Sequence, residues 1–127
     1  MADVFISYKR EDRRRVEALS QALIDLGLSV WFDYSIDVGE DWARRITSEL
    51  DAASAVIVCW TPAAVASDIV NLKAARAQKA RRLAAILLAP CSPPANLGGR
   101  FRLADLSSWR GDPTDKEFIT LVHALHG

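Results

Sequence analysis

The stretch Ala55-Val56-Ile57-Val58-Cys59-Trp60 decides the fold, because every one of its side chains is apolar. A strand that is apolar on both faces is expected at the centre of a parallel sheet that helices cover on each side. A second run of this kind, Leu83-Ala84-Ala85-Ile86-Leu87-Leu88, predicts another buried strand. Shorter runs at residues 4–6, 28–32 and 103–106 predict three further strands, the last of them at an edge.

Helices are predicted in the segments between these strands. The first begins at Arg13 and is stopped by Gly27. Its apolar side chains fall at helical spacing, at Val16, Leu19, Leu23 and Leu26. The second is capped by Asp41 and presents an apolar stripe of Trp42, Ile46 and Leu50. A third helix is expected over residues 67–81, and the last one opens with a capping box from Thr114 to Glu117.

The alternation of strands and helices predicts one α/β domain over residues 1–127. The expected architecture is a flavodoxin-like three-layer sandwich, with a central parallel sheet of about five strands and helices on both faces. Ligands of such sheets bind beyond the carboxyl ends of the strands. The loops after Ile6, Phe32 and Trp60 are therefore the candidate functional loops.

The composition favours no charged macromolecule as a partner. The chain has 127 residues and a formal net charge of zero, so neither nucleic acid nor an anionic membrane is expected to bind it. Two cysteines are too few for a disulfide framework, and no metal site is expected. The longest apolar runs fall well short of the roughly 20 residues that a membrane-spanning helix needs. We expect a cytoplasmic domain that is excised from, or fused to, a longer protein.

Two functions that this architecture often serves are disfavoured by the loops. A phosphorylated receiver domain needs an aspartate at the end of the third strand, where this chain has Cys59-Trp60-Thr61. A phosphate-binding loop needs glycines between the first strand and helix, and Ser7-Tyr8-Lys9-Arg10-Glu11-Asp12 has none.

Three segments resemble the conserved boxes of Toll/interleukin-1 receptor homology (TIR) domains of the bacterial type. They are Asp3-Val4-Phe5-Ile6-Ser7-Tyr8, the region from Val30-Trp31-Phe32-Asp33 to Trp42, and the short segment 106–109. The boxes come in the family's order and span essentially the whole chain. The resemblance implies a flavodoxin-like signalling module, related to those of innate immunity, that interacts with other TIR domains.

The resemblance also raises the question of catalysis, because many TIR domains hydrolyse or cyclise NAD⁺ at the ribose–nicotinamide bond. Their catalytic glutamate follows a tryptophan by four residues on the third helix, shortly after a serine. In this chain the serine is Ser67, but the tryptophan has become Ile69 and the glutamate Lys73.

A carboxylate at this position would stabilise the positive charge of an oxocarbenium-like transition state. A unit charge about 4 Å away is worth roughly 4 kcal/mol at an effective dielectric of 20, so an ammonium there slows cleavage on the order of a thousandfold or more. No catalytic residue is therefore assigned, and NAD⁺ glycohydrolase or cyclase activity is the alternative function.

The resemblance implies that NAD, as a ligand or substrate, would contact Tyr8, Lys9, Arg10, Phe32, Gly39 and Ser67; no cofactor is required. Each residue also has a structural interpretation. Tyr8 and Phe32 can be packing residues, Lys9 and Arg10 a solvated loop, and Gly39 the residue that a turn requires.

The placement of charge predicts an assembly surface. Residues 33–41 contain four acidic and no basic side chains, whereas residues 69–82 contain five basic and no acidic ones. The resemblance implies partners that are other TIR domains, homotypic or heterotypic, and complementary patches would join copies head to tail. The candidate interface residues are Asp37, Val38, Gly39, Glu40, Lys73, Arg76 and Lys79. The alternative is that both runs are solvated faces.

Overall fold

The computed structural model describes residues 3–32, 40–93 and 104–126, and contains one five-stranded sheet in which every pairing is parallel. The strand order is β2-β1-β3-β4-β5. The strands are β1 (Val4–Ser7), β2 (Val30–Phe32), β3 (Ala55–Trp60), β4 (Leu83–Leu87) and β5 (Ala104–Asp105). The helices are η1 (Arg10–Asp12), α1 (Arg13–Asp25), α2 (Glu40–Ala52), α3 (Pro62–Val65), α4 (Asp68–Lys79) and α5 (Lys116–His126). The predicted flavodoxin-like α/β fold is thereby confirmed.

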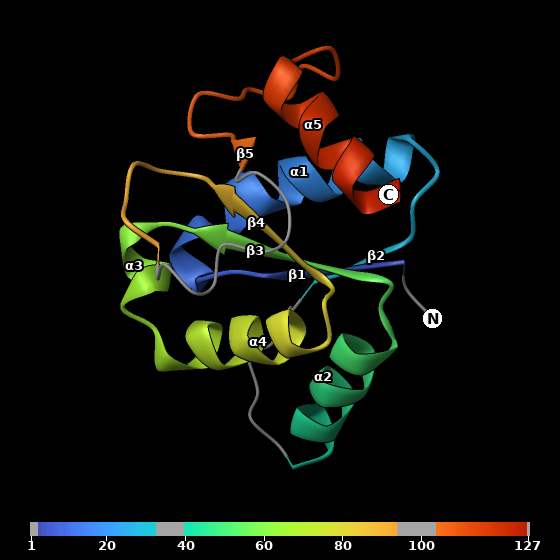
Figure 1. The fold of residues 1–127 in the computed structure, drawn as a ribbon, viewed down its shortest axis with the longest axis vertical. Coiled ribbons are helices and arrows are strands. Elements are labelled where there is room, and N and C mark those ends of the chain that lie inside the picture. Colours follow the sequence, from blue (N-terminus) through green and yellow to red (C-terminus); the bar gives the residue numbers. More distant parts are fainter. Residues whose placement is uncertain (1–2, 33–39, 94–103, 127) are drawn as a thin grey trace.

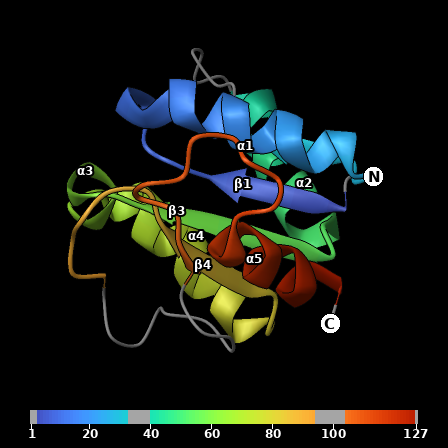
Figure 2. The ribbon, with the colours of Figure 1, turned by 90° about the horizontal axis from the view of Figure 1, so that it is seen from above.

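The fold has three layers, with α1 and α5 on one side of the sheet and α2 and α4 on the other (Figure 1). The central strand β3 supplies side chains to both cores. Ile57 and Cys59 join the cluster that includes α1 and α5, while Val58 and Trp60 join the cluster that includes α2 and α4. In the view from above in Figure 2, α1 runs alongside the strands. None of the described helices is long and apolar enough to cross a membrane.

Helix ends differ from the predictions in three places. Helix α1 ends at Asp25, so Leu26 falls outside it and is 50% exposed, not part of the core stripe. Gly27 does stop the helix, with a φ of 91° that favours glycine. Helix α2 begins at Glu40, which places Asp41 in the first turn and not at the cap position. The loop predicted after Trp60 contains the short helix α3, for which the Thr61 hydroxyl is the N-cap.

The capping box predicted for the last helix was also wrong. The Asp115 carboxylate accepts hydrogen bonds from the backbone N–H groups of Glu117 and Phe118, at 2.9 and 3.1 Å. The Thr114 hydroxyl lies outside the helix and donates to the Asp112 carboxylate at 2.7 Å. Two capping residues stand close together in the sequence, and the one nearer the helix caps it.

Helix α4 is fastened to the end of α2 by two arginines. The Arg76 guanidinium donates to both oxygens of the Asp51 carboxylate, from Nε at 2.7 Å and from Nη2 at 2.6 Å. Arg82 donates to the backbone carbonyl groups of Asp51 and Ala53. These carbonyls lie at the carboxyl end of α2, where the helix dipole favours a cation. The hydrogen bond from Arg76 lowers the pKa of Asp51 below its ordinary value.

We predict that Asp115→Ala lowers the free energy of unfolding by about 1 kcal/mol, the usual cost of a lost helix cap. Thr114→Ala is the matched control and is expected to change it far less, because its hydroxyl bonds to Asp112 and not to the helix. Urea unfolding of the two variants measures the difference. An equal loss in both would restore the capping box.

We predict that Arg76→Ala raises the pKa of Asp51 toward 3.8, because the largest cause of its lowering is removed. A lowered carboxyl pKa stabilises the fold above that ordinary value, and the contribution is lost as the pH falls through the lowered pKa. An NMR titration of the Asp51 carboxyl carbon measures the effect, with Lys79→Ala as the control on the same helix. An unchanged Asp51 pKa in Arg76→Ala would contradict the assignment.

Candidate functional site

The parallel strands bring their carboxyl ends to one edge of the sheet, and two of the following loops are joined there. The Thr61 hydroxyl, which follows β3, donates to the Asp12 carboxylate at the end of η1 at 2.8 Å. Thr61 is buried, and its oxygen also accepts the N–H of Ala64 in α3 at 3.2 Å. The loops after β1 and β3 are therefore held at a fixed position next to each other.

Two buried polar atoms at this edge have no hydrogen-bond partner among the described residues. They are Oγ of Ser7, the last residue of β1, and Nε1 of Trp60, the last residue of β3. Ser7 is in register with Val58, so Trp60 lies two residues further along the neighbouring strand and on the same face. Buried polar groups are nearly always paired, at a cost of about 1–3 kcal/mol when they are not. Both side chains are fully buried, so this unpaired acceptor and donor lie inside the edge and not on its surface.

The three residues of the degenerate catalytic motif lie at the start of α4 and on its first two turns. Ser67 is the N-cap, and its Oγ accepts the N–H of Val70 at 3.3 Å. Ile69 and Lys73 are four residues apart and so lie on one flank of the helix, beside its buried stripe. Lys73 is half-buried, whereas Ile69 is 66% exposed. Ser67 therefore has a structural role in the helix, whatever else it contacts.

The residues predicted in the loop after β1 divide between packing and solvent. Tyr8 is half-buried and packs against the core cluster on the α1 and α5 side of the sheet. Lys9 is half-buried and precedes η1 with extended backbone angles, and Arg10 is exposed. Contact of these residues with a nucleotide stays a prediction.

Other predicted residues lie wholly or partly outside the described part. Phe32 ends β2 in register with Ile6, and Glu40 begins α2, but their side chains are not described. Asp37, Val38 and Gly39 belong to the segment 33–39, which lies outside the described residues. Among the described residues no group of three histidine, cysteine or acidic side chains could hold a metal ion.

Some of the basic side chains in residues 69–82 are already bonded to other groups of the domain. Lys79, at the end of the helix, is exposed. Arg76 is already paired with Asp51, and Arg82 is bonded to the carbonyls at the end of α2. Two of the five basic side chains in residues 69–82, one of them the predicted interface residue Arg76, thus bind the end of α2 within the domain.

An apolar pair on the same helix was missed as a site. Leu72 is 72% exposed and follows Ile69 by three residues, so the two side chains are neighbours on the outer surface of α4. The buried stripe of this helix is Val70, Ala74 and Ala77, which leaves Ile69 and Leu72 facing solvent. The pair could have been found from the sequence. A helix that packs on a core through one face needs only one apolar face, and this helix has apolar residues on a second face as well.

Comparison with known proteins places this architecture in a family. The family model described as "TIR domain" matches residues 4–122. No curated protein matches the chain significantly. The TIR domain of the Toll-related receptor TRR-2 from Hydra magnipapillata superposes with a TM-score of 0.81 at 22% identity, covering 100% of both chains.

Two further solved structures share the fold. A metazoan TIR-STING receptor from C. gigas gives a TM-score of 0.72 at 18% identity, covering 95% of this chain and 39% of that one. The TIR domains of the activated Roq1 resistosome give 0.59 at 14% identity, covering 98% and 81%. At these sequence identities the superpositions show a shared fold, and the match to the family model shows family membership. The chain therefore belongs to the TIR domain family.

Proposed function

We propose that this TIR domain is an interaction module of a signalling protein, which self-associates or binds other TIR domains through α4. We define the α4 surface as Ile69, Leu72, Lys73, Arg76 and Lys79. The observation that carries the proposal is the exposure of Ile69 and Leu72, at 66% and 72%, next to each other on one helix. Free cysteines, buried at Cys59 and half-buried at Cys91, support a cytoplasmic setting.

The apolar pair supplies the affinity in this proposal. Fully burying a leucine or isoleucine side chain is worth about 1.5–3 kcal/mol, so this pair alone accounts for a substantial part of a micromolar contact. Apolar side chains surrounded by long polar ones are the usual arrangement of an interface centre and its rim. Lys73 and Arg76 follow Ile69 by four and seven residues, so both lie next to the pair on the helix surface.

Charge supplies orientation and not the main affinity. The acidic residues of segment 33–41 in a second copy would complement Lys73 and Lys79, and attraction of this kind mostly speeds association and fixes register. Because Arg76 is paired with Asp51, we assign it to the support of the surface. Contact between two different patches is heterologous and continues head to tail. The Roq1 TIR domains belong to a resistosome, and for this chain assembly is a proposal.

We further propose that NAD⁺ is not cleaved. The catalytic position is Lys73, and the nearest acidic side chain on α4 is Asp68, five residues earlier and on a different face. Asp12, the carboxylate held at the carboxyl edge, already accepts the Thr61 hydroxyl. The alternative function, an NAD⁺ glycohydrolase or cyclase, is favoured by one observation: Ser7 and Trp60 have unpaired polar atoms buried at the same edge.

We predict that replacing Ile69 and Leu72 together by serine weakens self-association about tenfold or more, because the apolar contact is lost. The matched control replaces Ile24 and Leu26, which are 46% and 50% exposed at the end of α1, on the other side of the sheet. Light scattering across a concentration series, at low and high salt, measures both. Monomers at every concentration, or equal weakening in the two variants, would refute the α4 surface.

We predict that the unmodified domain releases nicotinamide from NAD⁺ no faster than the uncatalysed reaction, since an ammonium at position 73 opposes the positive charge of the transition state. Lys73→Glu is the informative variant, and Lys79→Glu makes the same charge change at the exposed end of the helix. Nicotinamide release is followed at high protein concentration. Robust release by the unmodified domain would establish the alternative function.

A further inference from the structure

A cavity between α1 and the loop after β5 is lined by cationic and hydroxyl groups. Its volume is about 360 Å³, and it is bordered by Arg15, Ser107, Ser108, Trp109 and Arg110. A second hollow of about 230 Å³ shares three of these residues and adds Arg14. Neither hollow includes a residue of the α4 surface or of the degenerate catalytic motif.

Arg15 is fixed in place at the back of this cavity. Its guanidinium donates to three backbone carbonyl groups: that of Leu88 just after β4, that of Leu106 at 2.9 Å and that of Ser107 at 3.1 Å. A guanidinium has five N–H donors. These bonds therefore leave Arg15 with donors that can reach a ligand, on a group that is already immobile.

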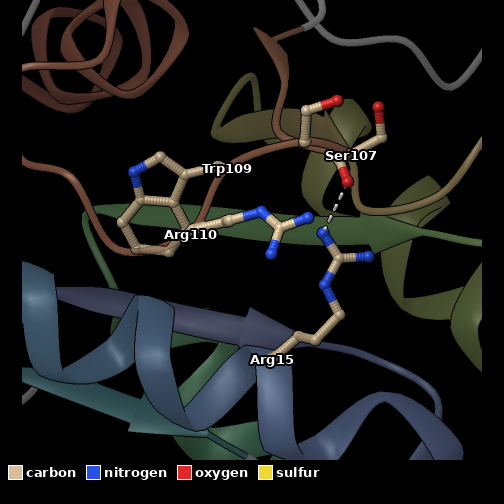
Figure 3. Close-up of a pocket in the computed structure, with 5 residues that line it drawn as sticks. Arg15, Ser107, Trp109 and Arg110 are labelled. Carbon is tan, nitrogen blue, oxygen red and sulfur yellow. Dashed lines mark hydrogen bonds between the residues drawn. The ribbon is translucent and has the colours of Figure 1, made fainter.

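Arg110 faces Arg15 across the cavity. Figure 3 shows the Arg110 guanidinium extending from the loop and pointing toward that of Arg15, beside the Trp109 ring. Arg14 comes from the same turn of α1 as Arg15 and borders the adjoining hollow. Within the described part of the chain, neither the Arg14 nor the Arg110 side chain has an ion pair or hydrogen bond. Three like charges at one opening repel one another unless an anion lies between them.

The carboxylates of this loop are engaged elsewhere. Asp105 accepts the N–H and the hydroxyl of Ser107, at 3.0 and 2.6 Å, and Asp112 accepts those of Thr114, at 2.9 and 2.7 Å. These hydrogen bonds lower the pKa of both carboxyl groups. Both acids are consequently ionised and locally bonded, and they partner backbone and hydroxyl groups in place of the arginines.

The loop that carries Arg110 is held in position before any ligand arrives. The Trp109 ring stacks on Phe118 of α5, with centroids 5.1 Å apart and nearly parallel planes at 9°. Its Nε1 donates to the carbonyl group of Asp112 at 2.8 Å. A preordered loop lowers the entropy that binding would otherwise lose.

We propose that this cavity binds the phosphoryl group of a small phosphate ester. A tetrahedral phosphoryl anion can accept hydrogen bonds from α1 on one side and from the Arg110 loop on the other, and guanidinium groups bind it with matching geometry. The volume lies at the lower end of the range for small-molecule sites. The site is independent of the proposed α4 surface, because α1 and α4 lie on opposite sides of the sheet.

The test is an NMR titration with glycerol 3-phosphate, following the Trp109 indole N–H and the amide signals of residues 107–111. Inorganic phosphate is a second probe, and it separates the need for an organic group from binding of the anion itself. Glycerol is the uncharged control, and ionic strength is held constant with chloride. We expect saturable shifts with a Kd in the low millimolar range or tighter, from roughly 4 kcal/mol of binding free energy converted by the standard relation.

The decisive variant is Arg110→Ala, with Lys79→Ala as the control that removes one exposed charge on the opposite side of the sheet. Arg110→Ala is expected to weaken binding about tenfold, and Lys79→Ala less than about twofold. Since Arg110 is exposed and unbonded, the variant should unfold at the same temperature as the unmodified domain. No saturable shift up to about 20 mM, shifts that glycerol reproduces, or equal affinity of the two variants would each overturn the proposal.

Discussion

The arrangement of the whole domain follows from the burial of β3 on both faces. Its side chains point alternately into two cores, and each core can be closed only by helices on its own side of the sheet. Because the connections are parallel crossovers, they return every strand in the same direction and collect the carboxyl ends at one edge. The two proposed sites, on α4 and around Arg15, are positioned by that one constraint. They lie on opposite sides of the same sheet.

The side chains of helix α4 have three roles in the domain. Val70, Ala74 and Ala77 fill the core, and their small size lets the helix lie close to the strands. Arg76, on the same side of the helix as Ile69 and Leu72, binds Asp51 and so fastens the helix to the end of α2. The outer surface shows Ile69 and Leu72 to solvent. Lys73 is half-buried and lies between the buried stripe and this outer surface.

The order and type of the elements were predictable from local pattern, because a strand apolar on both faces and a helix with one apolar stripe are recognisable without knowledge of the rest of the chain. The helix ends were less so. Leu26 fits the helical spacing of α1, yet the chain turns at Gly27 before Leu26 can pack. The role of Arg76 was not predictable at all, since Asp51 stands twenty-five residues away and only the tertiary fold joins them. Of the four acidic residues of segment 33–41, two lie in residues 33–39, outside the described part, and the side chains of Glu40 and Asp41 are not described.

Arg15 has a mechanical consequence for the last strand. Among the described residues, strand β5 pairs with β4 through Ala104 and Asp105 alone, and so short a ladder does little to hold the strand. The carbonyl groups that accept hydrogen bonds from Arg15 lie just past the ends of β4 and β5. A single side chain of α1 therefore links this helix to the ends of both strands. A displacement of the first turn of α1 relative to the edge of the sheet would therefore have to break or strain these hydrogen bonds.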